Sequence, residues 1–558
     1  MKKISKVLIA NLCAVMACSN LVGCGGGAKK DPTKTYLYVY NFDGGIGTDW
    51  LYEAADRFEA LYADYSFEEG KTGCIVEVTP GKASLDGIAS LPQSVFFTEQ
   101  VNYNDLIAQG LLLDISDVIT APLTDVKDCT ETGTIQDKLY EEQVDALPAL
   151  NGNYYVLPHY ECYSGVAYDV DLFNDKSLFI KEGTGTTQFT DLEGKLSVGP
   201  DGIRDTYDDG LPSSYEEFFA LMDKMVLKDV EPFIYSGKFP TYSNNLVTGL
   251  WAAYTGKDEF LLNVNFDSNA TEKEVKTEIV TDFNGETPII EEMTITPETG
   301  YLVNQQAGKY YALSFLQKAM SESKYFSKKI TNVLTHLGAQ TEYIYSKPTG
   351  KPIGMIIEGS YWYNEAKDSL KASAEAFPAT GKNRNFAFMP LPRQLEGQVQ
   401  EGQGVKNTLL DVLSSYAFIN ANCKNDPVTV DISKKFLQFV YTDAELLNFT
   451  KTTSVFKGVQ YNVDASVFEN MSHYAKNMFE MRSASDIIHP ISDSKIFMAS
   501  QSNFNYAGTS DSWASVVDGD SYSYPFSAYK SGKSVKKYFK GMWVSESKWN
   551  ESFSKYFD

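Results

Sequence analysis

Strand and helix patterns alternate along the first part of the chain, and this alternation constrains the fold more than any other feature. The periodicity predicts strands at 36–40, 74–78 and 94–97, an amphipathic helix beginning at Thr48 or Asp49, and a second helix over 104–113. This order is typical of an α/β protein with a largely parallel sheet, whose ligand crevice lies at the carboxyl ends of the strands. Asn41 and Asp43 follow the first strand, and Glu99 and Gln100 follow the third. We therefore expect these residues to face a ligand, with a cap or turn role as the alternative for each.

The length and the charge of the chain narrow the class of protein. Its 558 residues exceed what one hydrophobic core normally organises, so we expect at least two domains. The net charge of −24 disfavours nucleic acid as a partner. Cys74, Cys129, Cys162 and Cys423 lie too far apart for a CxxC motif and are too few for a disulfide framework. We expect free, buried thiols, although the sequence leaves one disulfide open.

The N-terminus carries the pattern of an exported, lipid-anchored protein. Three early lysines precede an apolar run over residues 7–18, which is shorter than the roughly 20 residues that a membrane-spanning helix needs. The next segment, Leu-Val-Gly-Cys at 21–24, resembles a lipobox. The resemblance implies a signal peptide over 1–23, a lipid on the sulfur of Cys24, a flexible tether over 24–33 and attachment to the extracytoplasmic face of the bacterial cell membrane. The alternative is an ordinary secretory signal that happens to contain a cysteine.

Several later segments together carry a family resemblance. They are Gly-Asn-Tyr-Tyr-Val-Leu-Pro at 152–158 with Gly-Val-Ala-Tyr-Asp-Val-Asp-Leu-Phe at 165–173, Gly-Met-Ile-Ile-Glu-Gly-Ser-Tyr-Trp-Tyr-Asn at 354–364, Phe-Ala-Phe-Met-Pro-Leu-Pro at 386–392, and the block 436–453. In order and spacing they resemble the extracellular solute-binding proteins of the large sugar-type class, which are maltose-binding-protein-like and serve ABC importers.

The resemblance implies a two-lobed α/β fold, the Venus flytrap, with mainly parallel sheets and several crossovers between the lobes. Under it we assign residues 34–157 and 391–456 to lobe one and residues 158–390 and 457–558 to lobe two. A polar stretch near 265–300 alternates around Asn284-Gly285, which predicts a surface β insertion with a type I′ turn. The resemblance also implies a small-molecule solute and a transmembrane ABC permease as partners, and we expect a monomer.

A sugar site needs aromatic rings for the C–H faces of the ligand and polar side chains for its hydroxyls. Tyr361 and Trp362, with Glu358 and Asn364, form the best such cluster in the sequence. We expect at least one of the two rings to contact the ligand. The alternative is a buried strand end with Trp362 in the core.

Other aromatic residues are weaker candidates for the same site. Tyr160 and Tyr163 lie beside the first crossover, where a local twist would send both rings to one side, and hinge packing is their alternative role. The remaining candidates are Trp251 with Asn244 and Asn245, and Trp513 with Asp511 and Asp518.

An acidic, glycine-punctuated loop is a candidate metal site. Its carboxylates belong to Asp201, Asp205, Asp208 and Asp209. Oxygen-rich loops of this kind suit Ca²⁺, although the spacing is not that of an EF-hand. The alternative is an acidic loop that precedes a helix and interacts with the helix dipole.

Enzymes are the main alternative class of function. The chain lacks HExxH, GxSxG and P-loop motifs, so metalloprotease, esterase and NTPase interpretations lack their parts. A glycoside hydrolase stays open, because its two carboxylates can lie anywhere in the sequence. A binder of a peptide or another non-sugar solute also stays open, because it shares the fold. We expect no catalysis and no required cofactor, and a lipid-anchored protein that captures an oligosaccharide or sugar by lobe closure.

Overall fold

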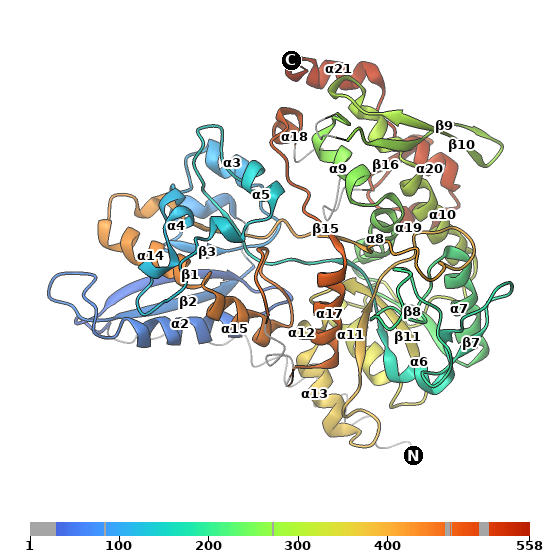
Figure 1. Ribbon diagram of the computed structural model, residues 1–558, viewed down its shortest axis with the longest axis horizontal. Coiled ribbons are helices and arrows are strands. Elements are labelled where there is room, and N and C mark those ends of the chain that lie inside the picture. Colours follow the sequence, from blue (N-terminus) through green and yellow to red (C-terminus); the bar gives the residue numbers. More distant parts are fainter. Residues whose placement is uncertain are drawn as a thin grey trace.

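The computed structural model describes residues 30–82, 85–269, 273–463, 469, 471–500 and 513–557. The predicted signal peptide, Cys24 and Asp511 lie outside the described residues. Figure 1 shows two α/β lobes side by side, joined by segments that cross between them. The two-lobed α/β fold that the resemblance implies is confirmed.

Lobe one is built on a five-stranded sheet in the order β2-β1-β3-β14-β4. Its strands are β1 (Thr35–Phe42), β2 (Cys74–Gly81), β3 (Val95–Phe97), β4 (Leu157–Pro158) and β14 (Tyr416–Ile419). β2 and β3 run parallel to β1, as the alternation predicts, whereas β14 runs antiparallel to β3 and β4. Leu37, Val39 and Phe96 have no exposed surface, so the apolar strand positions form the core of this lobe.

Helices pack around the sheet of lobe one. They are α2 (Asp49–Leu61), α3 (Tyr103–Ala108), α4 (Ser116–Thr120), α5 (Glu141–Ala146), α14 (Pro427–Phe439) and α15 (Asp443–Thr453). α2 begins where the sequence predicts, with Thr48 at its N-cap, but the Thr48 side chain makes no capping bond. Its hydroxyl instead accepts a hydrogen bond from Asn41 Nδ2 at 3.1 Å. α3 is shorter than predicted, because Leu112 pairs with Asn420 in an isolated β-bridge.

Lobe two is built on a four-stranded sheet in the order β12-β5-β11-β8. Its strands are β5 (Ser164–Asp169), β8 (Glu231–Ile234), β11 (Ile353–Gly359) and β12 (Phe386–Met389). β11 and β8 are parallel, but β5 runs antiparallel to both β11 and β12. The sheet is therefore mixed, unlike the mainly parallel sheet expected. The reason is that β5 starts at the edge facing lobe one, where the chain enters from β4, whereas β11 ends at that edge.

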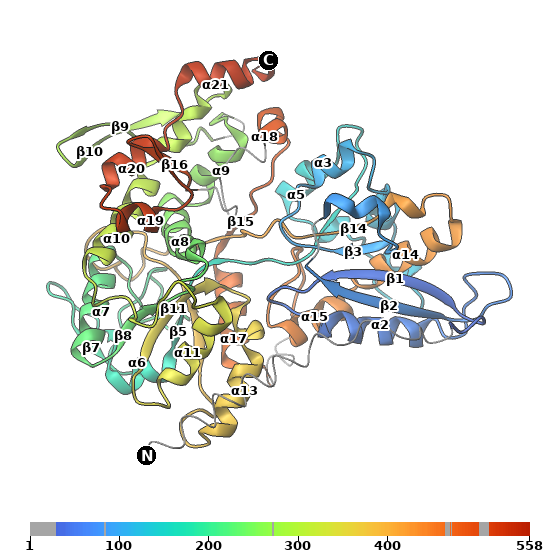
Figure 2. The same ribbon diagram turned by 180° about the vertical axis from the view of Figure 1, so that it is seen from behind.

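Some helices pack around the sheet of lobe two and others lie above it, as the view from behind in Figure 2 shows. They are α6 (Val170–Lys176), α7 (Tyr215–Leu227), α8 (Asn244–Thr255), α9 (Lys257–Asn265), α10 (Ala307–Ser321), α11 (His336–Ser346), α12 (Trp362–Glu365), α13 (Lys367–Ala376), α17 (His473–Ala484), α18 (Lys495–Ser500), α19 (Pro525–Lys530), α20 (Val535–Gly541) and α21 (Glu546–Phe553). Short strand pairs complete the described part of the chain: β6 (Phe179–Ile180) with β7 (Phe189–Thr190), β13 (Thr408–Leu410) with β15 (Asp486–Ile488), and β16 (Ser515–Val517) with β17 (Asp520–Tyr522).

The region near 265–300 contains an antiparallel hairpin of β9 (Lys276–Asn284) and β10 (Thr287–Thr294). Asn284 pairs with Thr287, so the turn consists of Gly285 and Glu286 rather than Asn284 and Gly285. A type I′ turn needs positive φ at both central residues. Only Gly285 has it, with φ of 64°. The turn is therefore not the predicted type I′ turn.

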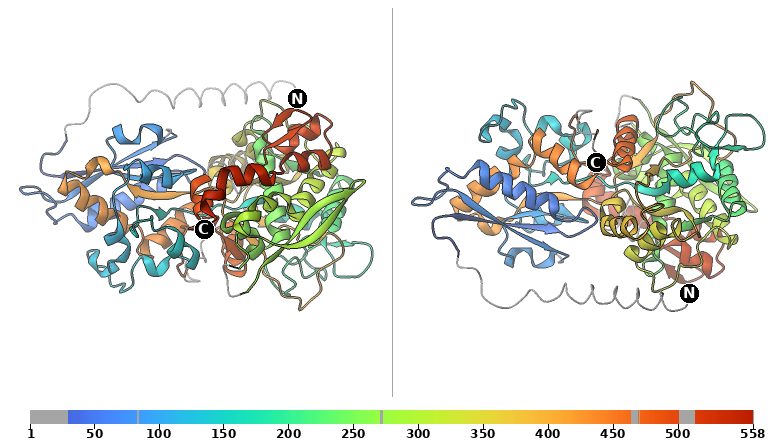
Figure 3. Two further views of the ribbon diagram at one scale, coloured as in Figure 1. Left: turned by 90° about the horizontal axis from the view of Figure 1, so that it is seen from above. Right: turned by 90° about the horizontal axis from the view of Figure 1, so that it is seen from below.

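The chain crosses between the lobes more than once. Crossings lie between β4 and β5, between β12 and β14, and between α15 and α17, so sequence-distant segments share each lobe. Figure 3 shows the lobes from above and below, with these segments between them. The lobe boundaries themselves stay a prediction. Cys74, Cys129, Cys162 and Cys423 are free thiols, of which Cys129 is only half-buried. Within the described residues, no helix combines the length and the apolarity needed to cross a membrane.

Candidate functional site

The two lobes touch where β1 of lobe one and β11 of lobe two end. Gly45, in the turn after β1, lies so close to Tyr361 that a Cβ on residue 45 would be 2.0 Å from the ring carbon Cδ2. Asn364 Nδ2 donates to the Gly45 carbonyl at 3.1 Å. Lys367 forms an ion pair with Asp49 beside this contact. The carboxyl ends of strands from both sheets therefore meet, which is where ligands bind in open α/β sheets.

A cluster of polar and aromatic side chains lies in lobe two behind this contact. We call it the lobe-two cluster, and it consists of Tyr242, His336, Gln340, Glu358, Tyr361 and Glu365. Gln340 Nε2 donates to Glu358 Oε1 at 3.2 Å and to Glu365 Oε2 at 2.7 Å. His336 Nε2 lies 3.5 Å from Glu365 Oε1. Burial and the neighbouring Glu365 raise the pKa of Glu358 well above its usual range. One amide thus lies between two carboxylates.

Aromatic rings border the lobe-two cluster. The rings of Tyr242 and His336 are stacked, with centroids 5.7 Å apart and planes 10° apart, and Phe239 lies 5.8 Å from His336. Burial, then the carboxylate of Glu358, raises the pKa of both Tyr242 and Tyr361. The two tyrosines therefore lie close to the carboxylates. Rings beside hydrogen-bond acceptors are the combination that a sugar site requires.

Lobe one contributes Glu99, at the end of β3. The hydroxyl of Tyr160, in the first crossing segment, donates to the Glu99 carboxylate. A Cβ on Gly44 would lie 2.2 Å from Glu99 Oε1, so the turn after β1 packs directly on this carboxylate. Burial raises the pKa of Glu99 to about 7; the Tyr160 hydrogen bond opposes this shift and Glu365 of lobe two adds to it. The charge of Glu365 in lobe two therefore contributes to the raised pKa of Glu99 in lobe one.

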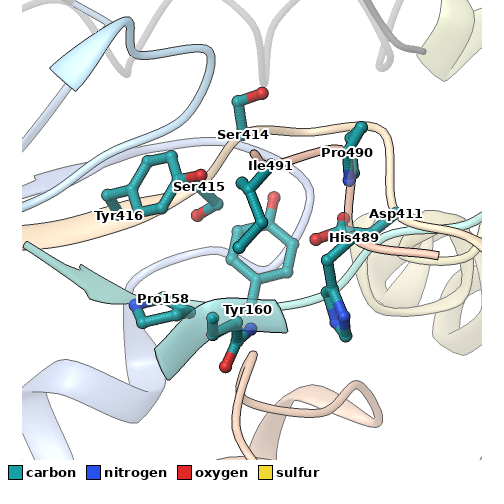
Figure 4. A pocket seen from close by; sticks show the side chains of 10 residues that line it. Pro158, Tyr160, Asp411, Ser414, Ser415, Tyr416, His489, Pro490 and Ile491 are labelled. Carbon is teal, nitrogen blue, oxygen red and sulfur yellow. The ribbon is translucent and has the colours of Figure 1, made fainter. Parts of the chain in front are cut away.

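A pocket adjoins this region at the crossing segments, with about 370 Å³ of space that includes open solvent. Figure 4 shows the Tyr160 ring rising between Ser415 and Ile491, with Asp411 and His489 to one side. We call it the hinge pocket, and it is lined by Gln143, Pro158, Tyr160, Asp411, Ser414, Ser415, Tyr416, His489, Pro490 and Ile491. Tyr160 thus links the pocket to Glu99.

A buried ionic network, formed by Glu142, Glu161, Arg482 and His489, lies beneath the hinge pocket. Arg482 Nε donates to Glu161 Oε2 at 2.8 Å, and His489 Nε2 lies 3.4 Å from Glu161 Oε1. His489 Nδ1 lies 3.0 Å from Glu142 Oε1. Burial alone would raise the pKa of Glu161, but Arg482 and His489 lower it to about 2. Burial disfavours the charged form of His489, yet Glu142 and Glu161 raise its pKa to about 9. We call these four residues the hinge network.

Three predicted tryptophans pack in cores rather than at the contact between the lobes. Trp362 has no exposed surface and contacts Phe386 and Tyr343, with centroids 5.4 and 5.7 Å away. Trp251 and Trp513 are also fully buried and contact each other at 5.8 Å. Trp513 Nε1 donates to Thr248, whereas Asp518 pairs with lysines at the surface. The structure therefore favours the core alternative stated for Trp362, and it places Trp251 and Trp513 in cores as well, because each of the three rings lacks a face that a ligand can reach.

Tyr163 does not turn to the same side as Tyr160. Its hydroxyl donates to Glu161, so its ring belongs to the hinge network side of the crossing segment. The alternation of the extended backbone sends neighbouring side chains in different directions here. The position of Tyr163 therefore matches the alternative given for it, which is packing in the hinge rather than contact with the ligand.

Some of the remaining candidates are buried or hydrogen-bonded within the protein, and the others are exposed to solvent. Asn41 is fully buried, and its Nδ2 donates to the Phe42 and Gly47 carbonyls, so it organises the turn after β1. Asp43 and Gln100 are exposed, and Gln100 has φ of 55°. Asn244 is buried at the start of α8, and Asn245 Oδ1 accepts from the Ser164 hydroxyl at 2.9 Å.

The acidic loop uses its carboxylates to hold its own backbone. Asp208 Oδ2 accepts from the Asp201 N–H, and Asp209 Oδ2 accepts from the Asp205 N–H, both at 3.0 Å. Burial and Asp201 raise the pKa of Asp208 to about 7. Nowhere in the described part of the chain are three or more His, Cys, Asp or Glu side chains grouped to hold a metal ion. Calcium binding stays a prediction that this geometry does not favour.

Sequence reasoning missed four of the six residues of the lobe-two cluster and all of the hinge network. Tyr242, His336, Gln340 and Glu365 come from a 3-10 turn, α11 and α12, and no local motif sets them apart. Glu365 directly follows Asn364, so a candidate cluster extended by one residue beyond 354–364 would have included it. Glu161 lies between Tyr160 and Tyr163, but its partners Arg482 and His489 are more than 300 residues away in sequence.

Comparisons with known proteins bear on the family and on the fold. A family model described as bacterial extracellular solute-binding protein matches residues 44–446. Among solved structures, one titled chitin oligosaccharide binding protein matches with a TM-score of 0.51 and 13% sequence identity. The alignment covers 93% of this chain and 99% of that chain. At this identity the likeness shows the fold alone. A search of curated protein sequences finds no match.

Proposed function

Because the chain belongs to the family of bacterial extracellular solute-binding proteins, we propose that it captures an oligosaccharide or other sugar between its lobes and delivers it to an ABC permease. The solved structure of the same fold, titled chitin oligosaccharide binding protein, supports a sugar as the solute. The partners proposed are therefore a small carbohydrate and a transmembrane permease, and the proposed working form is a monomer.

The single observation that carries the sugar proposal is the contact of Gly45 with Tyr361 and Asn364, which brings the lobe-two cluster opposite Glu99. Tyrosine rings offer flat apolar faces to the C–H groups of a pyranose, and carboxylate and amide oxygens accept its hydroxyl protons. Glu99 of lobe one joins the rings and acceptors of the lobe-two cluster only when the lobes are close. Lobe closure around a solute is thus the proposed mode of capture.

The crossing segments are the proposed hinge for this closure. The hinge network joins the first crossing segment to α17 and to the chain after β15 through Arg482 and His489. Lys257 of lobe two lies 3.2 Å from Glu142 of lobe one, so one salt bridge spans the lobes at this end. A rigid, buried hinge lets the two sheets move as bodies while their strand ends separate.

Capture and release need no catalysis, so we propose a binding protein and not an enzyme. The family that matches is one of binding proteins. The two carboxylates of the lobe-two cluster share a single amide donor and lie behind aromatic rings. Glycoside hydrolysis instead needs two carboxyl groups on either side of the scissile bond. The proposal requires no cofactor.

We further propose that Cys24 carries a lipid that holds the protein at the extracytoplasmic face of the membrane. The lipobox-like residues 21–24 support this anchor. The family description supports an extracytoplasmic location. A short anchored tether keeps the binding lobes near the permease that receives the solute.

Isothermal titration calorimetry of the purified protein against a panel of oligosaccharides and monosaccharides tests the proposal. A ligand that binds only the folded protein also raises its melting temperature in proportion to RT ln(1 + [L]/Kd). We expect at least one glycan to bind and to be recovered intact by mass spectrometry. Cleavage of that glycan, or binding of peptides but of no glycan, would contradict the proposal.

A further inference from the structure

The lobe-two cluster holds two carboxyl groups and more hydrogen-bond acceptors than its own donors satisfy. Glu358 is 1% exposed, and its carboxylate receives hydrogen bonds from Gln340 Nε2 and from the Gly359 N–H. Across the described ranges, neither Glu358 nor Glu365 forms an ion pair with a lysine or arginine. Besides the hydrogen bond from Gln340 Nε2, Glu365 has the imidazole of His336 at 3.5 Å as its basic neighbour. A buried carboxylate is normally paired with a cation; without one, this pair keeps a proton, in line with the raised pKa of Glu358.

Gln340 gives a second, independent indication of a missing donor. Its side chain is 1% exposed, and its Oε1 has no hydrogen-bond partner among the described residues. Since Nε2 of the same amide already bonds both carboxylates, the unpartnered oxygen lies inside the cluster. A buried acceptor without a donor is costly, so a ligand that donates a hydrogen bond to this oxygen would gain binding energy.

The cluster can be reached from its outer edge and is bordered by rings. The Glu365 and His336 side chains are 13% and 22% exposed, so solvent reaches the acidic pair at that edge. The stacked rings of Tyr242 and His336 lie there as well. Aromatic faces attract cations, and the attraction grows when water is excluded.

Lobe one adds further carboxyl groups near the contact between the lobes. Glu99 receives the Tyr160 hydroxyl; burial raises the pKa of Glu99, and the carboxylate of Glu365 adds to that shift while Lys82 opposes it. The exposed carboxylate of Asp43 also acts on Glu99. Lys367, the nearby lysine on α13, is already paired with Asp49. Closure therefore surrounds the ligand with carboxylates from both lobes.

We propose that the captured sugar is an amino sugar with a free, protonated amine, and that this amine binds between Glu358, Glu365 and the Gln340 carbonyl. The inference rests on the proposed sugar-binding function. An ammonium group offers three donors and no acceptor, whereas a hydroxyl or an acetamide brings an acceptor with its donor. Only the ammonium both fills the unpartnered acceptor and balances the charge of the two carboxylates.

Three matched β-1,4-linked tetrasaccharides test the proposal, with an amine, an acetamide or a hydroxyl at every C2 position. The purified full-length protein is titrated with each by calorimetry at about pH 6, where a sugar amine is protonated. We expect the amine form to bind at least roughly tenfold more tightly than the other two. Raising the salt concentration should weaken the amine form most, because only its binding includes charge attraction.

Charge-neutral variants locate the effect. Glu358→Gln and Glu365→Gln each keep the size of the side chain, and each should lower the amine preference by roughly tenfold. Glu342→Gln is the matched control, because Glu342 lies on the same helix as Gln340 but pairs with Lys329 at the surface. That control should keep the wild-type preference. If Glu358→Gln fails to fold, Glu365→Gln at the exposed edge carries the same test.

The outcomes separate this inference from the function on which it rests. Equal or tighter binding of the acetylated or the hydroxyl tetrasaccharide would overturn the amine inference and leave sugar capture standing. An amine preference that survives in both Glu→Gln variants would also overturn it. Failure of all three tetrasaccharides and of the wider glycan panel to bind would overturn sugar capture, and the amine inference with it.

Discussion

The backbone of Gly45 in lobe one lies against the ring of Tyr361 in lobe two, where an added Cβ would approach ring carbon Cδ2 to 2.0 Å. No side chain larger than hydrogen fits there unless the ring or the lobe moves. A larger residue at position 45 should therefore hinder any lobe closure that brings these strand ends together. Asn364 holds the same turn through the Gly45 carbonyl at 3.1 Å.

Gly45→Ala should weaken binding of the cognate sugar by roughly tenfold, because about 1.4 kcal/mol of destabilisation of the closed form lowers the apparent affinity by that factor. Calorimetry measures the loss, and small-angle scattering with saturating ligand should show a larger radius of gyration than for wild type. Gly133→Ala is the control, since its Cβ would meet its nearest atom, Asp137 Oδ2, at 3.5 Å. Wild-type affinity in Gly45→Ala would contradict a closure that uses this contact.

Tyr361 and Trp362 are neighbours in sequence and should respond differently to truncation. Tyr361 is partly exposed at the contact between the lobes, so Tyr361→Ala should reduce sugar binding by about 2 to 4 kcal/mol, and Tyr361→Phe by much less. Trp362 is fully buried, so Trp362→Ala should lower the free energy of unfolding by about 3 to 5 kcal/mol without ligand. Chemical unfolding and calorimetry of the same samples separate the two effects. The reverse result would place Trp362, not Tyr361, at the ligand.

His489 should make the protein less stable at alkaline pH. Its pKa in the folded state is raised to about 9 from the ordinary 6.5, so its ion pairs contribute fully below about pH 6.5 and are lost as the pH rises through about 9. The contribution is of the order of 3 kcal/mol. Urea unfolding between about pH 6 and 10 should therefore show a smaller loss of stability in His489→Gln than in wild type. Glu142→Gln removes one of the two carboxylates that pair with His489. The dependence of its unfolding free energy on pH should therefore be intermediate between those of wild type and His489→Gln. Identical slopes in all three proteins would contradict a charged His489 in the hinge network.

Cys24 is the predicted site of lipid attachment, and Cys24→Ala tests it. The variant should lack acyl chains and should either keep its first 23 residues or be released from the membrane, because the lipid is the proposed anchor. Metabolic labelling with a fatty acid, followed by cell fractionation, measures both properties. Cys423→Ala, which removes a buried thiol far from the N-terminus, is the labelling control. Normal labelling of Cys24→Ala would rule out this cysteine as the anchor.

Some features of the fold follow from local sequence patterns. The alternation of Leu37 and Val39 specified β1, and the apolar spacing after Thr48 specified α2, because each pattern matches the period of one element. Strand ends could be located in the same way, so Asn41 and Glu99 were placed correctly at the ends of strands. Their roles toward a ligand stay predictions.

Features that depend on contacts across the chain were decided only by the tertiary structure. Periodicity cannot show that Trp362 faces the Tyr343 and Phe386 rings while Tyr361 faces Gly45, because the burial of a ring is set by whatever packs on it. The direction of β5 followed from where the chain enters lobe two, not from its own residues. The pairing of Arg482 with Glu161, and of Gln340 with Glu358 and Glu365, likewise arises from packing of separate elements. The sequence by itself thus determined the elements and the family, whereas long-range packing decided which side chains are buried, paired or left for a ligand.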